Sequence, residues 1–291
     1  MPVVSALAVY PVKSLAGTPT DAMTVDTSGP RGDRRWMLVD RAGETLTARK
    51  HPAMLGARAT PVDGGVRLSA PGRPTLVVDE PAGPADVPVR MTRLESATHA
   101  GAAADAWCSE LVGRPARLLW LDDPARRGMA EKHGGTLDDP MSLNDSGPLH
   151  VTTTASLARL DAWAAEVHDE RVERALTRGE PAPPPRQPLD MRRFRPNLVV
   201  DGDLEAFAED RWSGLVVGDV ELRFADLCGR CVMTTIDPDT QVKGKEPLVT
   251  LARHRRWDGE LWFGIQMVPV RTGRIAVGDP VEVVGARAGA R

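Results

Sequence analysis

The sequence predicts an α+β fold that is predominantly β, in which a small barrel or curled sheet precedes a second β-rich domain with few helices. Short runs of β-branched and aliphatic residues, bounded by turn residues, fill the first hundred positions and return after residue 197. Only two segments place apolar residues at helical spacing. The length of 291 residues exceeds the usual size of one domain, so two domains are expected.

The first half contains strands joined by turns. Two hairpins are expected, one across residues 41–44 and one across Pro71-Gly72. Apolar residues at four-residue intervals in 102–111 predict a short helix that Gly113 and Pro115 would end. The strands expected in this half are residues 3–9, 36–39, 45–47, 66–68, 76–78 and 116–121.

The second half begins with a long polar loop, residues 122–147, which we expect to shape a site because such loops in compact domains are often functional. A hydroxyl-rich start at residues 152–154, followed by apolar residues on one helical face, predicts a helix that ends near Gly179. The five prolines of residues 180–189 predict an extended linker. Strands are expected after it at residues 197–200, 215–217, 220–224 and 275–284.

Charge and hydropathy argue against two classes of partner. The formal net charge is −3 and the pI is about 6.1, so no overall positive field attracts nucleic acid or an anionic membrane. No apolar run is long enough to cross a bilayer, and the first residues lack the basic start and cleavage site of a signal peptide. We therefore expect a cytoplasmic protein that binds any anion through local groups.

Three cysteines, Cys108, Cys228 and Cys231, are too few and too unevenly placed for a disulfide framework. They also fall short of the four thiolates that hold a plant-type iron–sulfur cluster, so no such cluster is expected in this chain. If the protein transfers electrons, they must arrive from another protein.

Cys228 and Cys231 form a C-x-x-C pattern directly after a predicted strand. A zinc site would need a second pair of thiolates or imidazoles, which the six scattered histidines do not offer. A thioredoxin-like motif should open a helix, whereas strand-like sequence flanks this one. Two interpretations stay open: a thiolate ligand or nucleophile favoured by the charge of Arg230, or two buried structural thiols, which is the commoner use of cysteine.

Basic residues gather at three predicted strand ends, namely at Lys13, at Arg34-Arg35 and at Arg192-Arg193 with Arg195. Each group alone is most simply a solvated surface, although guanidinium groups at strand ends also suit phosphate recognition. Residues 145–148, before the second helix, are either a plain capped turn or, with the helix N-terminus, a place for an anion.

Nine short motifs are spread over nearly the whole chain, and as a set they are highly specific. Together they resemble the MOSC family with its N-terminal β-barrel domain, in the branch of the mitochondrial amidoxime-reducing component and its bacterial relatives. The motifs are Tyr10-Pro11-Val12-Lys13-Ser14, Gly32-Asp33-Arg34, Leu46-Thr47-Ala48-Arg49, Asp145-x-x-Pro148, Ala155-Ser156-Leu157, Phe194-Arg195-Pro196-Asn197, Cys228-x-Arg230-Cys231, Thr234-Thr235-x-Asp237-Pro238 and Val277-Gly278-Asp279-Pro280.

This resemblance implies a domain organisation and a cofactor. An N-terminal β-barrel domain would span residues 1–121 and pack on a MOSC β-barrel domain over residues 122–286, with a disordered tail at 287–291. A molybdenum cofactor would lie between the domains, with the thiolate of Cys231, and not Cys228, as the protein ligand to the metal. The resemblance places its phosphate on Lys13, Ser14 and Arg34. It places further cofactor contacts on Asp145, Ser146, Gly147, Arg195 and Asn197.

The implied activity is the reduction of a small N-hydroxylated substrate, with electrons from a separate donor protein of ferredoxin or flavoprotein type. Asp145 is the expected catalytic carboxylate beside Cys231, and Asp145 or Asp237 would supply a proton. Two other functions stay open: a sulfur carrier that uses a persulfide on Cys231, and a carrier that delivers the cofactor elsewhere. No pyridoxal phosphate is expected, and a monomer is the default.

Two positions depart from the pattern of the family. Gln241 stands where relatives often carry glycine, so the local turn is expected to differ. Gly147 offers no hydroxyl where some relatives have one, which removes one cofactor contact.

Overall fold

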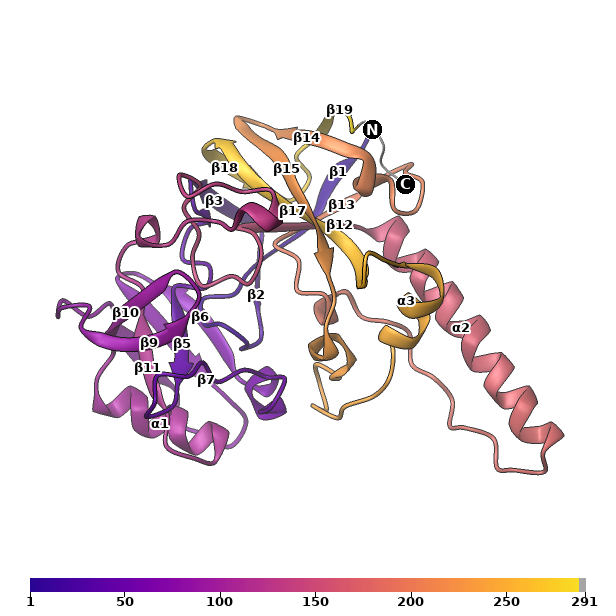
Figure 1. Ribbon diagram of the computed structural model, residues 1–291, viewed down its shortest axis with the longest axis horizontal. Helices are drawn as coiled ribbons and strands as arrows, with labels where there is room; N and C mark the ends of the chain where they lie inside the picture. The colour runs from indigo at the N-terminus through magenta and orange to yellow at the C-terminus, as the bar shows by residue number, and fades with distance from the viewer. Residues whose placement is uncertain (288–291) are drawn as a thin grey trace.

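The computed structural model describes residues 1–287 and shows two lobes, with a long helix projecting from one of them (Figure 1). A nine-stranded sheet forms most of the upper lobe, and three smaller sheets account for the other strands. Strands far outnumber the three α-helices of the described residues, which confirms the predicted α+β, predominantly β fold.

The large sheet has the order β19, β14, β15, β17, β12, β13, β1, β2, and β16 pairs with β17. Only β12 and β13 are parallel neighbours, and α2 (Thr154–Thr177) provides the crossover that a parallel pair requires. The strands of this sheet are β1 (Val3–Val9), β2 (Thr18–Thr20), β12 (Leu149–Thr153), β13 (Leu198–Asp201), β14 (Trp212–Val217), β15 (Val220–Gly229), β16 (Arg256–Trp257), β17 (Glu260–Arg271) and β19 (Val281–Ala286).

The three smaller sheets have the orders β18-β3-β4, β5-β11-β10-β9 and β6-β7-β8. Their strands are β3 (Ala22–Asp26), β4 (Gly29–Pro30), β5 (Trp36–Val39), β6 (Arg58–Val62), β7 (Gly65–Ser69), β8 (Leu76–Asp79), β9 (Val87–Met91), β10 (Leu94–His99), β11 (Arg117–Trp120) and β18 (Gly273–Ala276). The other helices are α1 (Ala102–Val112) and α3 (Leu248–His254).

The start of the chain is built into the sheets of its second half. β1 pairs with β13, and β3 pairs with β18. In the opposite direction, Ile236 packs into the apolar core of the first lobe. The strands within residues 1–26 therefore pair with strands that follow residue 197. The predicted domain boundary at residue 121 would assign these paired strands to different domains.

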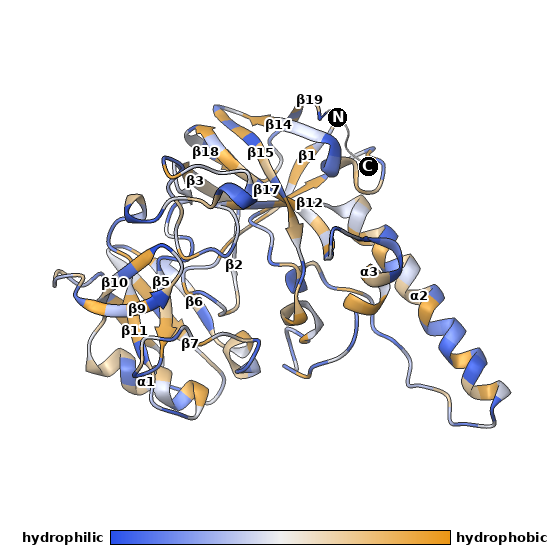
Figure 2. Ribbon diagram, viewed as in Figure 1, coloured by the Kyte–Doolittle hydropathy of each residue, from blue (hydrophilic) through white to orange (hydrophobic). Residues whose placement is uncertain are grey.

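Apolar side chains fill the interior of both lobes, and the far end of α2 is hydrophilic (Figure 2). The predicted hairpin over residues 66–78 is confirmed as β7 and β8, paired through Val66 and Val78. The strand β17 and the short helix α3 were not predicted. In β17 the residues from 263 to 269 are all buried, so the sequence lacks the alternation that marks a strand with one solvated face.

The end of the described chain is anchored. The backbone N–H of Arg287 donates to the carbonyl of Arg211 at 2.7 Å. Apart from Arg287, the predicted disordered tail lies outside the described residues. Within residues 1–287, none of the helices has the length and apolar composition that crossing a bilayer demands.

The buried carboxyl group of Glu209 lies against the start of α2, and we expect it to make the stability of the protein depend on pH. Glu209 accepts hydrogen bonds from Ser156 at 2.8 Å and Thr153 at 3.2 Å, and burial raises its pKa from 4.5 to about 7. Because the folded state keeps this proton to a higher pH than the unfolded chain, stability present below pH 4.5 is lost as the pH rises to about 7. We expect a loss of about 3 kcal/mol across that window.

The measurement is urea unfolding of the parent and Glu209→Gln at several pH values between 5 and 8. The variant keeps an acceptor for both hydroxyls and cannot ionise, so its free energy of unfolding should change less with pH. Equal pH profiles for the two proteins would assign the effect to other groups.

Candidate functional site

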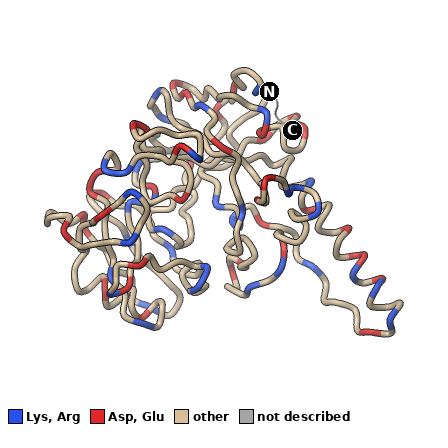
Figure 3. Tube along the Cα trace, in the orientation of Figure 1, with Lys and Arg blue, Asp and Glu red and all other residues tan. Residues whose placement is uncertain are grey.

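A cavity of about 330 Å³ lies where the two halves of the chain meet. The first half contributes residues between 13 and 49, and the second contributes the end of β15, part of β17 and the loop before β12. The long polar loop over residues 122–147 thus contributes residues to the lining of this cavity. Figure 3 shows Lys and Arg segments on both sides of the region where the lobes meet.

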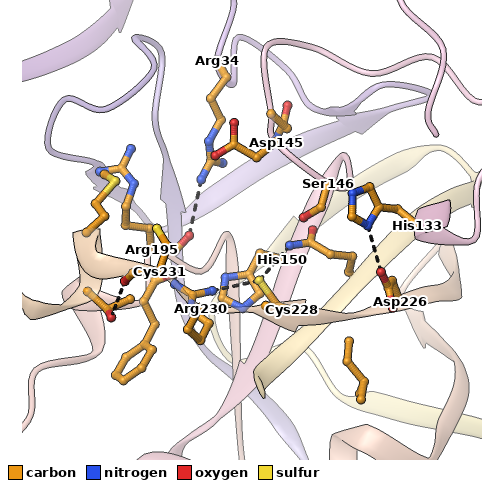
Figure 4. Close-up of a pocket in the computed structure, with 18 of the residues that line it drawn as sticks. Arg34, His133, Asp145, Ser146, His150, Arg195, Asp226, Cys228, Arg230 and Cys231 are labelled. Atoms are coloured by element: carbon orange, nitrogen blue, oxygen red, sulfur yellow. Dashed lines mark hydrogen bonds and ion pairs between the residues drawn. The ribbon is translucent and has the colours of Figure 1, made fainter. Parts of the chain in front are cut away.

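Eight of the nine predicted cofactor residues line this cavity (Figure 4): Lys13, Ser14, Arg34, Asp145, Ser146, Gly147, Arg195 and Cys231. The ninth, Asn197, lies behind the wall and is fully buried. Its Oδ1 accepts from Arg34 Nη1 at 3.1 Å and from the backbone N–H of His150 at 3.2 Å. Asp237 does not line the cavity. It accepts instead from Arg193 at 2.6 Å and from its own turn.

The two cysteines of the C-x-x-C pattern have different surroundings. Cys228 is buried near the end of β15, where its sulfur accepts from Arg230 Nη1 at 2.8 Å and from Gln266 Nε2 at 3.0 Å. Cys231 follows the strand, is half-buried and borders the cavity. Cys228 therefore fits the structural interpretation, and Cys231 is the thiol available to a ligand.

Tyr10, the only tyrosine of the chain, holds two arginines that are distant in sequence. The guanidinium carbons of Arg34 and Arg195 each lie 4.3 Å from the centroid of its ring. The Tyr10 hydroxyl donates to the carbonyl of Pro196 at 3.0 Å. Burial first, and then the charge of Arg34, lowers the pKa of Arg195 to about 10, so an anion beside the pair would relieve an unfavourable concentration of positive charge.

Three residues of the cavity wall have left-handed backbone conformations. The φ angles are 69° at Ser14, 44° at Arg34 and 57° at Arg195. For residues other than glycine this conformation costs about 1–2 kcal/mol each. Such strain persists where the surrounding structure enforces it, commonly at binding sites.

Asp33 connects the two halves beneath the cavity. This carboxylate is 1% exposed and accepts from Arg34 Nη1 at 2.5 Å, from Asn197 Nδ2 at 3.0 Å and from the backbone N–H of Tyr10 at 2.8 Å. It fixes the groups that aim Arg34 at the cavity. Asp33 belongs to the Gly32-Asp33-Arg34 motif, which by itself predicts no role for this carboxylate.

Replacing Tyr10 should separate the contribution of its ring from that of its hydroxyl. Tyr10→Phe keeps the stacking and loses one hydrogen bond, so the free energy of unfolding should fall by about 1 kcal/mol. Tyr10→Leu also leaves two guanidinium groups without a ring, and the fall should be about 3 kcal/mol. Urea unfolding of both variants gives the two values. Equal losses would mean that the stacking contributes nothing.

Asp145 is held by two cations that also line the cavity. Its oxygens lie 2.5 Å from Lys13 Nζ and 2.8 Å from Arg49 Nη2. Lys13 above all, with Arg49, holds the pKa of the Asp145 carboxyl well below its usual range. The carboxylate is therefore ionised at neutral pH, which suits the positioning of these cations better than the donation of a proton. Its catalytic role stays a prediction.

Two models of domain families match the chain. The MOSC N-terminal beta barrel domain matches residues 1–115, and the MOSC domain matches residues 138–282. The mitochondrial amidoxime-reducing component 1 of Homo sapiens is 31% identical, in an alignment that covers 97% of this chain and 83% of the human protein. The chain belongs to the MOSC family.

Two further relatives carry informative names. The mitochondrial amidoxime reducing component 2 of Homo sapiens is 31% identical over 96% of this chain and 82% of its own length. A molybdenum cofactor sulfurase of Oryza sativa subsp. japonica is 29% identical over 88% of this chain, which corresponds to 31% of the plant protein. The chain is thus similar both to proteins named for amidoxime reduction and to a protein named for sulfuration of the molybdenum cofactor, which points to an association with that cofactor.

Sequence reasoning missed several residues of this MOSC cavity. Arg49 belongs to a recognised motif, yet its contact with Asp145 depends on folding. Although burial opposes the effect, Asp145 and a Cys231 thiolate raise the pKa of Arg49, which places the guanidinium beside that sulfur. His133 and Asp226 also border the cavity, with Nδ1 and Oδ2 3.0 Å apart. Their separation of 93 residues left no local signal.

The lining of the MOSC cavity fits a polar, anionic cofactor. Three buried polar atoms have no hydrogen-bond partner among the described residues 1–287, namely Gln266 Oε1, Asn144 Oδ1 and Arg230 Nε. All three residues line the cavity, and buried polar atoms normally find a partner, so they offer contacts to a bound molecule. Within residues 1–287, no three His, Cys, Asp or Glu side chains are grouped to hold a metal ion.

Both departures from the MOSC pattern have structural consequences. A β-carbon at Gly147 would lie 2.7 Å from Cβ of Gln266, so a side chain there requires Gln266 to shift. Gln241 keeps a left-handed turn, with φ of 57°, and its amide donates to the carbonyls of Pro238 and Asp239. The expectation of a different turn at Gln241 is thus not supported by its backbone, which has the conformation that favours glycine.

Proposed function

We propose that the chain is a molybdenum cofactor-dependent oxidoreductase that reduces small N-hydroxylated compounds, such as amidoximes, to amidines or amines. The observation that carries the proposal is the half-buried thiol of Cys231 in a cavity whose other walls present Lys13, Arg34 and Arg195. A soft thiolate suits molybdenum held by a pterin dithiolene, and the cations suit the pterin phosphate. The names of the relatives at 31% identity support the same chemistry.

In this proposal the residues of the chain bind and orient. Cys231 ligates the metal. Arg34 and Arg195, both against the Tyr10 ring, bind the phosphate with Lys13 and Ser14, and Asn197 fixes Arg34. When bound, the cofactor supplies the two-electron chemistry that cleaves an N–O bond. The balanced reaction consumes two electrons and two protons and releases the oxygen as water. A separate ferredoxin- or flavoprotein-type partner supplies the electrons, because the three cysteines are too few for a plant-type cluster.

His133 is the side chain best placed to deliver a proton. It borders the same cavity as Cys231, and its ring nitrogen lies 3.0 Å from Asp226, which orients the imidazole. Histidine is the side chain that most often transfers protons in enzymes, whereas Asp145 is ionised at neutral pH. His150 also lines the cavity, but burial keeps its pKa well below the usual value and the ring neutral.

The test is metal and pterin analysis of the purified protein, followed by an activity assay. Molybdenum and oxidised-pterin fluorescence should each appear in amounts equimolar with protein, and the protein should reduce benzamidoxime with an artificial electron donor. Protein that carries pterin and molybdenum but does not reduce any N-hydroxylated compound would act as a cofactor carrier. The absence of pterin from the purified protein would contradict the proposal.

A sulfur carrier is the second candidate, favoured by the relative named as a molybdenum cofactor sulfurase. The half-buried Cys231, with the Arg49 guanidinium beside it, is a reactive thiol that could hold a persulfide. Persulfide transfer requires no phosphate site, whereas Arg34 and Arg195 form one. Sulfide release from Cys231 by a reductant, in protein without pterin, would favour this function over the reductase.

The predicted cytoplasmic location stays a prediction. The curated relatives are named as mitochondrial, which describes those proteins. Likewise, a monomer remains the default expectation.

A further inference from the structure

A second cavity, of about 400 Å³, adjoins the one that contains Cys231. The two cavities share five lining residues, so they are neighbours separated by side chains: Lys13, Thr47, Arg49, His133 and Asp145. None of the site predictions made from the sequence uses the remaining residues of this second cavity.

The second cavity concentrates positive charge in a chain whose net charge is −3. Seven Lys or Arg residues line it, against two carboxylates, Glu44 and Asp145. The carboxylates pair with Arg90, at 3.4 Å, and with Lys13 and Arg49. The other cations have no carboxylate within salt-bridge distance in residues 1–287, and they come from segments far apart in the chain: Lys50, Arg93, Arg127 and Lys132.

Arg127 is the buried member of this group, with 4% of the residue exposed. It donates to main-chain carbonyls only, through Nη1 to Ser142 and, at 2.9 Å, to Asn144, and through Nε to Thr92 at 3.1 Å. These hydrogen bonds hold the loop before Asp145 in place, but neutral carbonyl groups do not neutralise the positive charge of Arg127. Burial above all, and also Arg93, lowers the pKa of Arg127 to about 10, although the charge of Asp145, which already pairs with Lys13 and Arg49, opposes the effect. A buried charge without a counter-ion is unfavourable, and a bound anion would supply one.

We propose that this second cavity is an anion site that binds a phosphate-bearing group next to the cofactor cavity. Its volume falls within the range of small-molecule sites. A small ligand can reach a buried arginine in a concave site, whereas a protein surface would contact only the exposed rim of the cavity. The site therefore favours a small ligand. The phosphate has two possible sources, a nucleotide extension of the cofactor or a free phosphorylated ligand. The site does not depend on the proposed reaction, because binding is measured without turnover.

The test uses the purified full-length chain and the double variant Arg93→Gln/Lys132→Gln. Both residues are exposed and line only the second cavity, so the variant should fold and bind as much pterin as the parent. Two measurements are made: nucleotide released on denaturation, and calorimetric binding of adenosine monophosphate with adenosine as the uncharged probe. The control for a change of two charges is Arg67→Gln/Arg178→Gln, at exposed positions outside both cavities.

Equimolar nucleotide in the parent, and less in the double variant, would support the site and identify the cofactor as the source. If no nucleotide is released, adenosine monophosphate should bind the parent at least about tenfold more tightly than the double variant, since two charged hydrogen-bonding groups are lost. That result would support the site with a free ligand as the source. The proposal is overturned if neither measurement distinguishes the double variant from the control, or if adenosine binds as well as its phosphate. Failure of the cofactor proposal would appear separately, as absence of pterin from the parent.

Discussion

Replacing Cys231 with alanine should abolish reduction of benzamidoxime while the protein remains folded. The thiol is half-buried, and the Arg49 guanidinium beside it also pairs with Asp145, so the loss of the thiol should cost little stability. Metal analysis should show the loss of molybdenum, and pterin fluorescence should persist because Lys13, Arg34 and Arg195 remain. The rate should fall by at least about 100-fold, since loss of even an indirect partner of a metal ligand typically costs 10–100-fold.

Cys228→Ala is the matched control, because the two cysteines stand three positions apart and differ in their surroundings. Removal of the Cys228 sulfur leaves the Arg230 and Gln266 donors without their acceptor, so the free energy of unfolding should fall by about 1–3 kcal/mol. Molybdenum should stay bound to Cys231. The opposite pattern, with metal lost from Cys228→Ala and kept in Cys231→Ala, would overturn the assignment of the ligand.

Replacing Asp33 with asparagine should destabilise the protein and weaken cofactor binding together. The substitution leaves Arg34, which is largely buried, without its carboxylate and disturbs the hydrogen bonds to Asn197 and Tyr10. Breaking a buried ion pair by removing one partner costs about 3 kcal/mol or more. For a chain of this size the melting temperature should fall by about 6–12 °C. Calorimetry gives the melting temperature, and pterin fluorescence gives the cofactor content.

Asp26→Asn tests the same kind of ion pair where it is exposed. Arg31 is bidentate to Asp26 at 2.9 and 3.0 Å, but the two side chains are 68% and 38% exposed. Loss of this exposed ion pair should lower the free energy of unfolding by less than about 1 kcal/mol and leave pterin binding intact. If Asp33→Asn is as mild as this control, the carboxylate beneath the cavity does not organise the site.

Much of the candidate site could be predicted because its residues occupy short motifs. Lys13, Ser14, Arg34 and Cys231 were expected at one cofactor, and all border one cavity. The contributions of Arg49, Asp33 and the His133–Asp226 pair were not predicted. Each depends on partners between 23 and 164 residues away, apart from the neighbouring Asp33–Arg34 pair, so no local pattern reports them. The basic cavity beside the site was likewise hidden, because each cation alone resembles a solvated surface residue.

By itself, the sequence determined the elements whose residues have a local signature. The alternation in β7 and β8, the apolar face and threonine cap of α2, and the motifs that mark the family depend only on neighbouring positions. The tertiary structure alone decided that Cys228 is buried while Cys231 is half-buried at the cavity, and that Arg34 and Arg195 both lie against the Tyr10 ring. The physical reason is that these contacts follow from strand order and register, and β1 reaches β13 only after nearly two hundred residues.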